Sequence, residues 1–140
     1  MADERESTAG FERVDHIGIV VRDVDAALPY YIDQLGMSLV HREELADIAT
    51  ELAYLDAGNT MIQLVAPIAP GFLSEHLDEQ GEGLHHVCFG VDDIPAFLTA
   101  HGLHEQGPIF MGGRQRRACF LRERPNNLLI EVTENASDAG

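Results

Sequence analysis

Two histidines, a glutamine and a glutamate stand at matching points of two repeated stretches of this sequence. They are His16 and Gln63 in the first copy and His86 and Glu131 in the second, at nearly equal separations. The repeated stretches are 15–23 with 85–93, and 61–65 with 129–133. Imidazole nitrogen, amide oxygen and carboxylate oxygen together suit a borderline or hard divalent ion. The repeat therefore predicts a metal enzyme built from a duplicated module.

Each of these four residues lies in an apolar run that is typical of a β-strand. A single histidine in such a strand is more often structural than a metal ligand, and the same holds for Gln63 or Glu131 alone. A buried polar side chain without a partner is costly, however, and here both copies carry one at the equivalent place. Agreement between the copies is what favours a shared metal site over four unrelated structural residues.

The elements that must position these residues follow the same order in both copies. The first copy predicts a strand over 14–21, a helix that ends at Gly36, and strands over 38–42, 50–56 and 60–66. The second copy predicts a strand over 84–91, a helix that ends at Gly102, and strands over 107–110, 117–122 and 128–133. We therefore expect an α+β fold in which two tandem βαβββ modules form one curved mixed sheet around a metal site.

Acidic residues precede each predicted helix and are suited to cap it. In the first copy, Asp23 or Asp25 can accept hydrogen bonds from the first turn, and Pro29 then falls in that turn, where backbone N–H groups have no helical partner. In the second copy, Pro95 takes the corresponding place after Asp92 or Asp93.

The chain length and composition predict one domain between two short tails. With 140 residues and a hydrophobic fraction of 45%, the chain can form a substantial core. We expect a disordered N-terminal tail over 1–12, a single domain over 13–134 and a C-terminal tail over 135–140. Within the domain, module one spans 13–67, a linker helix spans 71–80 and module two spans 84–134.

The charge balance excludes one class of partner and leaves one local anion site open. A net charge of −15 with no basic stripe argues against binding to a nucleic-acid backbone. Five arginines do cluster late in the chain, and Arg114 and Arg116 among them could bind a phosphorylated or carboxylated ligand. The alternative, that they are solvated loop and strand residues, is about equally favoured by the sequence.

Two further features bear on location. No apolar run approaches the roughly 18–20 residues that a membrane-spanning helix needs, so no membrane association is expected. Cys88 and Cys119 provide no disulfide framework and both lie in apolar strand-like runs. We interpret them as buried, reduced thiols, which fits a cytoplasmic protein.

Glu51 is a candidate general base. It alternates with Ala49 and Ala53, and small neighbours on the same strand face would leave room for a substrate above the sheet. The residues alone favour the other interpretation, an exposed glutamate at a sheet edge. Glu43 and Glu44 have the pattern of surface charge.

These motifs resemble those of the vicinal-oxygen-chelate superfamily, which includes glyoxalase I, bleomycin-resistance proteins and extradiol dioxygenases. The likeness covers 14–134 and is greatest to the methylmalonyl-CoA epimerase family. It rests on the segments 15–19, 41–44, 81–87, 91–94 and 129–132.

The resemblance implies a ligand set, a cofactor and a reaction. The ligands would be His16, Gln63, His86 and Glu131, holding one divalent ion such as Co, Ni, Mn or Zn. Glu51 and Glu131 would be the two catalytic bases that flank the reacting carbon. The implied substrate is a 2-substituted malonyl-CoA, an acyl-CoA epimerised through a metal-stabilised enolate, and the implied assembly is a homodimer.

The chain also departs from that family. Family members commonly carry a His-Pro-Lys stretch before the last strand, whereas 121–127 here reads Leu-Arg-Glu-Arg-Pro-Asn-Asn. Two alternatives therefore stay open: another enzyme of the superfamily, such as a glyoxalase-like lyase or isomerase, or a non-catalytic small-molecule-binding protein of the same fold. A binding protein would not need four ligands and a base.

Overall fold

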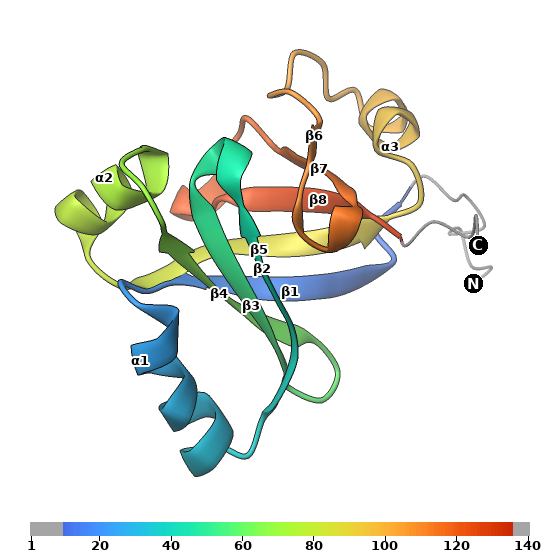
Figure 1. Ribbon diagram of the computed structural model, residues 1–140. Helices are drawn as coiled ribbons and strands as arrows, with labels where there is room; N and C mark the ends of the chain where they lie inside the picture. The colour runs from blue at the N-terminus through green and yellow to red at the C-terminus, as the bar shows by residue number, and fades with distance from the viewer. Residues whose placement is uncertain (1–9, 136–140) are drawn as a thin grey trace. The chain divides into compact units, whose positions relative to one another are not determined.

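A computed structural model of the protein describes residues 10–135, so most of the predicted tails, 1–9 and 136–140, lies outside the described residues. The strands are β1 (Arg13–Val20), β2 (Ser38–Leu45), β3 (Thr50–Asp56), β4 (Met61–Pro67), β5 (Gly83–Val91), β6 (Phe110–Met111), β7 (Arg117–Phe120) and β8 (Ile130–Glu134). The α-helices are α1 (Val24–Pro29), α2 (Phe72–Gln80) and α3 (Ile94–Ala100), and Figure 1 labels all of these elements. Short helical turns cover Tyr30–Gln34, Ala46–Ile48, Gly113–Gln115 and Pro125–Asn127.

Contacts divide the described chain into two compact units. The N-terminal unit is His16–His86, and the C-terminal unit combines 10–15 with 87–135. The boundaries fall inside β1 and β5, so each of these strands contributes residues to both units.

In the N-terminal unit the strand order is β2-β3-β4-β1. β1 runs parallel to β4, and the β2–β3 and β3–β4 pairs are antiparallel. One face of this sheet packs against α1, through a cluster that includes Ala53, Leu55 and Leu64. The other face carries Leu52, Tyr54 and Val65, which cluster with Leu77 of α2. Both faces of β3 are therefore buried.

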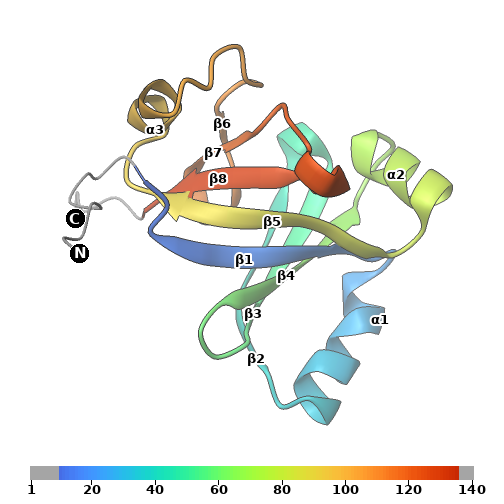
Figure 2. The same cartoon turned by 180° about the vertical axis from the view of Figure 1, so that it is seen from behind.

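The C-terminal unit repeats this topology with the order β5-β8-β7-β6. β5 runs parallel to β8, and β7 pairs antiparallel with β8 and with β6. α3 packs on β7 and β8, as Figure 2 shows from behind, and its Ile94 and Phe97 cluster with Cys119 and Val132. The predicted α+β class, with two tandem βαβββ modules and mixed strand pairing, is confirmed.

The two helices that follow β1 and β5 begin alike and end differently. Asp93 caps α3 by accepting a hydrogen bond from the Ala96 N–H at 2.8 Å, and Pro95 lies in the first turn as predicted. The prediction for Pro29 is wrong, because Asp23 caps α1 and Pro29 is its last residue. Proline lacks a backbone N–H, and the chain continues as a π-helical turn in which Leu35 N–H donates to the Tyr30 carbonyl.

Strand bounds differ from the predicted ones mainly at the sheet edges. β2 extends to Leu45, three residues further than predicted, because it pairs with β3 along its whole length apart from a bulge between Leu39 and His41. Strand β6 is only Phe110–Met111, whereas the sequence predicted 107–110.

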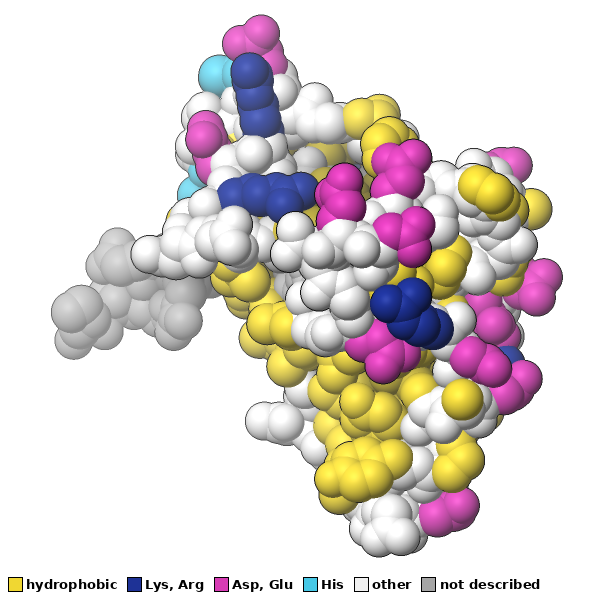
Figure 3. Space-filling view, turned by 90° about the vertical axis from the view of Figure 1, so that its left-hand side faces the viewer, with side chains coloured by type: hydrophobic (Ala, Val, Ile, Leu, Met, Phe, Trp, Pro, Cys, Tyr) yellow, Lys and Arg dark blue, Asp and Glu magenta, His cyan; other side chains and the backbone are white. Residues whose placement is uncertain are grey.

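The surface bears out the acidic composition. Figure 3 shows acidic side chains spread over one face, where the few basic ones form no continuous stripe. Cys88 and Cys119 are both buried and unbridged, as predicted. Among the residues that the structure describes, no helix is long and apolar enough to cross a membrane.

Candidate metal centre

Strand pairing in the N-terminal unit aligns residues from three strands in one row across the sheet. Gly18 of β1 lies opposite Gln63 of β4, and Gln63 lies opposite Tyr54 of β3. Paired residues project from the same face of a sheet. Because alternate residues along a strand share a face, His16 projects from this face as well.

The two predicted histidine ligands of this unit lie side by side. His16 and His86 are 2% and 3% exposed, and their Nε2 atoms are 3.2 Å apart. Two imidazole nitrogens at 2.0–2.1 Å from a common ion would be separated by roughly 3 Å. The pair therefore has the spacing of two ligands of one ion.

Gly18 makes this approach of the two rings feasible. A Cβ atom built at Gly18 would lie 2.1 Å from Cε1 and 2.6 Å from Nε2 of His86. The His86 ring thus occupies the space above Gly18 that any other side chain would fill. The φ of Gly18 is not positive, so its backbone conformation does not require glycine. The space taken by the His86 ring does.

His85 supports His86 from the side away from His16. Its Nδ1 lies 2.8 Å from Nδ1 of His86, and its ring meets His76 of α2 edge to face at 4.9 Å between centroids. Histidine ligands are commonly oriented by a hydrogen bond at the second ring nitrogen. This contact leaves His86 Nε2 directed toward His16.

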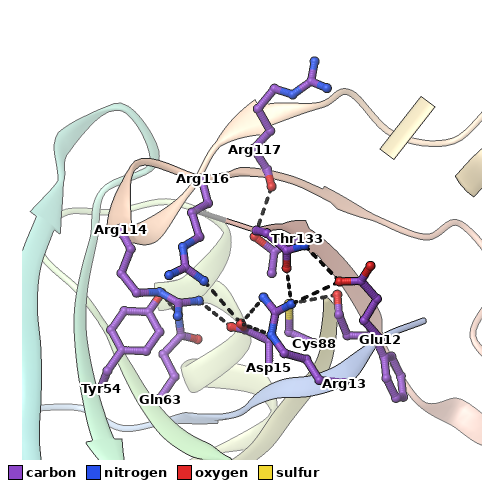
Figure 4. Close-up of polar contacts among 12 residues, drawn as sticks. Glu12, Arg13, Asp15, Tyr54, Gln63, Cys88, Arg114, Arg116, Arg117 and Thr133 are labelled. Carbon is purple, nitrogen blue, oxygen red and sulfur yellow. Dashed lines mark hydrogen bonds and ion pairs between the residues drawn. The ribbon is translucent and has the colours of Figure 1, made fainter. Parts of the chain in front are cut away.

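Gln63 presents an acceptor that the described residues do not satisfy. Its Nε2 donates to the Tyr54 hydroxyl at 2.9 Å, a contact drawn among those of Figure 4. Its Oε1 is buried and has no hydrogen-bond partner among residues 10–135. A buried amide oxygen in that state costs free energy unless a ligand engages it. The arrangement fits a metal ion, because the oxygen held away from Tyr54 is a donor to such ions.

The fourth predicted ligand, Glu131, belongs to the C-terminal unit. It is 7% exposed and lies opposite Cys88 on β5 and Phe120 on β7. Burial raises the pKa of the Cys88 thiol, and the Glu131 carboxylate raises that pKa further. Without a metal ion, the neutral thiol form of Cys88 is therefore favoured.

Arg114 and Arg116, the predicted anion-binding residues, converge with Arg13 on buried Asp15 (Figure 4). The Asp15 side chain is 2% exposed and accepts from Arg13 Nη2 at 2.8 Å. It also pairs with Arg114 Nη2 and with Arg116 Nη1, the latter at 3.6 Å. A buried carboxylate is tolerated only with such partners. Part of the arginine charge therefore stabilises the C-terminal unit itself.

Glu51, the predicted second base, lies on the face of β3 opposite to the one that bears Tyr54. Glu51 lies three residues from Tyr54 on β3 and therefore projects from the opposite face, the one covered by α1. Its carboxylate is bound by Arg42, with Nε at 2.7 Å and Nη2 at 2.6 Å. Arg42 also pairs with Asp25 of α1 at 2.8 Å, which fixes the face unambiguously. Ala49, expected beside Glu51, lies outside β3 in a left-handed turn.

Three residues on the ligand-bearing face were not predicted as site residues. Tyr54 was not considered, and His41 and Glu43 of β2 were assigned no role or a surface role. The turn between β3 and β4 is short, and counting outward from it pairs Tyr54 with Gln63 once the ends of the turn are known from the structure. The same count places Glu51 on the other face.

Comparisons with known proteins agree with this fold and place it in a superfamily. The chain is 30% identical to an ethylmalonyl-CoA/methylmalonyl-CoA epimerase of Cereibacter sphaeroides, over 87% of this chain and 97% of that protein. It is 27% identical to a probable lactoylglutathione lyase of Vibrio cholerae, over 88% and 91% of the two chains. The crystal structure of methylmalonyl-CoA epimerase from Mycobacterium tuberculosis superposes with a TM-score of 0.83 at 30% identity, covering 96% of this chain and 95% of that one. Residues 15–120 match the family model, and the chain belongs to the glyoxalase/bleomycin resistance protein/dioxygenase superfamily.

Proposed function

We propose that this protein is a metal-dependent enzyme that epimerises a 2-substituted malonyl-CoA such as methylmalonyl-CoA. The observation that carries the proposal is the buried Oε1 of Gln63, held by Tyr54 on the face that also bears the adjacent rings of His16 and His86. Relatives at 30% identity that carry the name of such an epimerase support the choice of reaction.

The proposed ligands are His16, Gln63, His86 and Glu131, with Co, Ni, Mn or Zn as the candidate ions. Two neutral nitrogens, a neutral oxygen and one carboxylate leave a divalent ion with a net positive charge and open positions. A divalent ion bound there would polarise the carboxylate and thioester oxygens of the substrate and so acidify its C2 proton. Gln63 in place of a carboxylate keeps that charge higher.

Glu131 is the proposed base of the C-terminal unit. Its buried position on β8 excludes bulk water, which favours proton transfer to and from carbon over exchange with solvent. Cys88 lies opposite it on β5, and burial raises the pKa of the Cys88 thiol. An epimerase needs a proton donor on each face of C2, so Glu131 accounts for one of the two.

Arg114 and Arg116 stay candidates for binding the anionic end of an acyl-CoA. A guanidinium has five N–H donors, so pairing with Asp15 does not exhaust either side chain. If they bind substrate, replacing both by alanine should raise KM for the CoA ester more than for a short thioester. A homodimer in the cytoplasm is proposed on the resemblance alone.

A glyoxalase-like isomerase or lyase is the second candidate, and the position of Glu51 favours it. With Glu51 on the α1 face, Glu131 alone of the two predicted bases is left for the reaction. One base is enough to move a proton between neighbouring carbons, whereas inversion at one carbon needs two. Relatives named as probable lactoylglutathione lyases make this a concrete alternative.

Proton NMR of methylmalonyl-CoA in D₂O tests the proposal. Each epimer is incubated with metal-loaded protein, and loss of the C2 proton is followed after subtraction of spontaneous exchange. We expect exchange that EDTA abolishes and that Glu131→Gln slows by at least about 100-fold. Glu51→Gln is the matched control and should exchange at the rate of the unmodified protein. Absence of exchange in protein shown to contain metal would contradict the epimerase proposal, and turnover of a glutathione hemithioacetal would then support the second candidate.

A further inference from the structure

Arg114 lies in a tight turn of the C-terminal unit whose backbone conformation does not suit arginine. The Arg116 N–H donates to the Gly113 carbonyl at 3.3 Å and closes this turn between β6 and β7. The two central residues, Arg114 and Gln115, have left-handed φ values of 59° and 55°. Turns of this kind favour glycine, asparagine or aspartate at both places, because longer side chains crowd the backbone there. Arginine at position 114 therefore carries a backbone strain that other residue types would avoid.

The same turn occurs a second time in this unit, with residues that suit it. The Leu128 N–H donates to the Pro125 carbonyl at 3.0 Å, and the central residues Asn126 and Asn127 have φ values of 57° and 63°. Asparagine tolerates the left-handed conformation better than most other residues. The geometry of the turn alone therefore does not account for arginine at position 114, and its guanidinium group is the feature to be explained.

Asp15 holds the Arg114 side chain in the interior of the unit. Arg114 Nη2 pairs with Oδ2 of Asp15, while Arg13 and Arg116 reach Oδ1 of the same carboxylate (Figure 4). The side chains of Arg114 and Asp15 are 12% and 2% exposed. Buried ion pairs often contribute no more stability than apolar side chains of similar volume. Strain and buried charge at one residue therefore favour a role in ligand binding over a purely structural role.

This ion pair lies next to the proposed base of the same unit. A carboxylate oxygen of Asp15 and Sγ of Cys88 are within 4.8 Å of each other. Cys88 in turn lies opposite Glu131 in the parallel pairing of β5 with β8. A group bound by Arg114 would thus belong to the acyl end of a thioester on which Glu131 acts, and not to its distant nucleotide end.

Resting on the epimerase proposal, we infer that Arg114 binds the free carboxylate of the 2-substituted malonyl group and that Asp15 is the positioning residue for its guanidinium. A guanidinium has five N–H donors in a rigid fork, and one carboxylate engages two of them in a bidentate contact. The side chain can therefore bind Asp15 and a second carboxylate at the same time. Arg114 thus recognises the acid group that distinguishes a malonyl thioester from a simple acyl thioester, and not the phosphates of CoA.

Two ligands that differ only in this carboxylate test the inference. Dimethylmalonyl-CoA and pivaloyl-CoA both lack a C2 proton, and pivaloyl-CoA has a methyl group in place of the carboxylate. Their dissociation constants are measured by calorimetric titration of metal-loaded unmodified protein, Arg114→Asn, Arg114→Lys and Arg117→Gln. Asparagine is chosen because it suits the turn, as it does at Asn126. Arg117 is the matched control, because it lies in the same unit but pairs with Glu134 at the surface, with its side chain 43% exposed.

For Arg114→Asn we expect the affinity for dimethylmalonyl-CoA to fall by at least about 10-fold, while that for pivaloyl-CoA stays within about twofold. Arg114→Lys keeps the charge but loses the fork geometry, so its affinity for dimethylmalonyl-CoA should lie between those of Arg114→Asn and the unmodified protein. Arg117→Gln should change neither affinity by more than about twofold. The metal content should be the same in all four proteins, since neither arginine is a proposed ligand.

An equal fall in affinity for both ligands in Arg114→Asn would overturn the inference, because Arg114 would then bind the phosphates of CoA or only support the fold. Unchanged affinity for both ligands would overturn it as well. If Arg114→Asn does not fold, Arg114→Lys decides by the same criterion, a loss confined to dimethylmalonyl-CoA. Unmodified protein that binds dimethylmalonyl-CoA no more tightly than pivaloyl-CoA would instead refute the epimerase proposal.

Discussion

The two units place their last ligand in the same register but surround it differently. In the N-terminal unit Gln63 lies opposite Gly18, and in the C-terminal unit Glu131 lies opposite Cys88. Gly18 and Cys88 each follow the histidine of their repeat by two residues, so the duplication is conserved down to single register positions. The glycine accommodates the ring of His86, whereas the cysteine fills its own space and is fully buried.

The antiparallel neighbours differ in the same sense. Tyr54 lies opposite Gln63 and accepts a hydrogen bond from it, while Phe120, which offers no hydroxyl, lies opposite Glu131. A neutral amide has to be turned so that its oxygen, not its nitrogen, faces an ion, and Tyr54 does this. A carboxylate presents oxygen in either orientation. The duplicated strand register thus determines the position of each proposed ligand, and the residue opposite it determines whether its side chain is oriented by a hydrogen bond.

Loss of a histidine ligand should have the largest effect on metal affinity. His86→Ala removes one of the two adjacent imidazoles, and we expect metal affinity to fall by more than about 100-fold, beyond the effect of an outer contact. His85→Ala removes only the supporting contact to Nδ1 and should lower the affinity by about 10-fold to 100-fold. Titration of apo-protein with cobalt measures both. Equal affinities in the two variants would show that His86 is not a ligand.

The second largest effect on metal binding is expected from replacing a glycine by alanine, and the two units should respond differently. Gly18→Ala would place Cβ 2.1 Å from the His86 ring, so the ring must move and we expect metal loss close to that of His86→Ala. Gly90→Ala in the C-terminal unit is the control, because its Cβ would meet the guanidinium of Arg13, 2.3 Å from Cζ. That end of a flexible side chain can shift, so this variant should keep its metal. Retention of metal by both variants would refute the role given to Gly18.

A smaller effect is expected from making the two antiparallel neighbours alike. Tyr54→Phe gives Gln63 the same kind of partner that Glu131 has, and the amide loses the contact that orients it. We expect metal affinity to fall by about 10-fold, measured by competition with a chelator. Tyr30→Phe removes a hydroxyl from an exposed tyrosine of the same unit and should change nothing. An unchanged affinity in Tyr54→Phe would mean that the hydroxyl does not orient Gln63.

The smallest effect is expected at Glu51. Glu51→Gln weakens an ion pair with Arg42 whose side chains are 18% and 32% exposed, so the free energy of unfolding should drop by roughly 0–1 kcal/mol. Metal content and proton exchange should not change, because this carboxylate lies on the α1 face. Urea denaturation and the exchange assay measure the two quantities. Loss of exchange would return Glu51 to the reaction and contradict the face assignment.

The repeat made much of this arrangement predictable from sequence. The strands that carry His16, Gln63, His86 and Glu131 are apolar and have these polar residues at matching points of the two copies. Because side chains alternate along a strand, the position of each of them determines which neighbours lie on the same face. His16, Gln63 and His86 accordingly project where the pattern placed them. The pairing of Glu131 with Cys88 follows from the same alignment.

Glu51 and the residues of β2 show where such reasoning fails. β3 is buried on both faces, so its hydrophobic pattern does not distinguish the ligand-bearing face from the α1 face. On β2, a bulge between Leu39 and His41 shifts the register, and no glycine or proline in that segment predicts the bulge. Only pairing counted from the β3–β4 turn separates the two faces, and that requires the structure of the turn.

X-ray absorption spectroscopy of the cobalt-loaded protein distinguishes the proposed ligand set from its alternatives, because it reports the atoms around the ion. The proposed ligand set predicts one ion per chain with two imidazole groups and otherwise oxygen ligands, and the loss of one imidazole in His86→Ala. A sulfur neighbour at about 2.3 Å would contradict it, since Cys88 would then be a ligand in place of a neutral thiol. An unchanged spectrum in His86→Ala would place the ion elsewhere in the molecule.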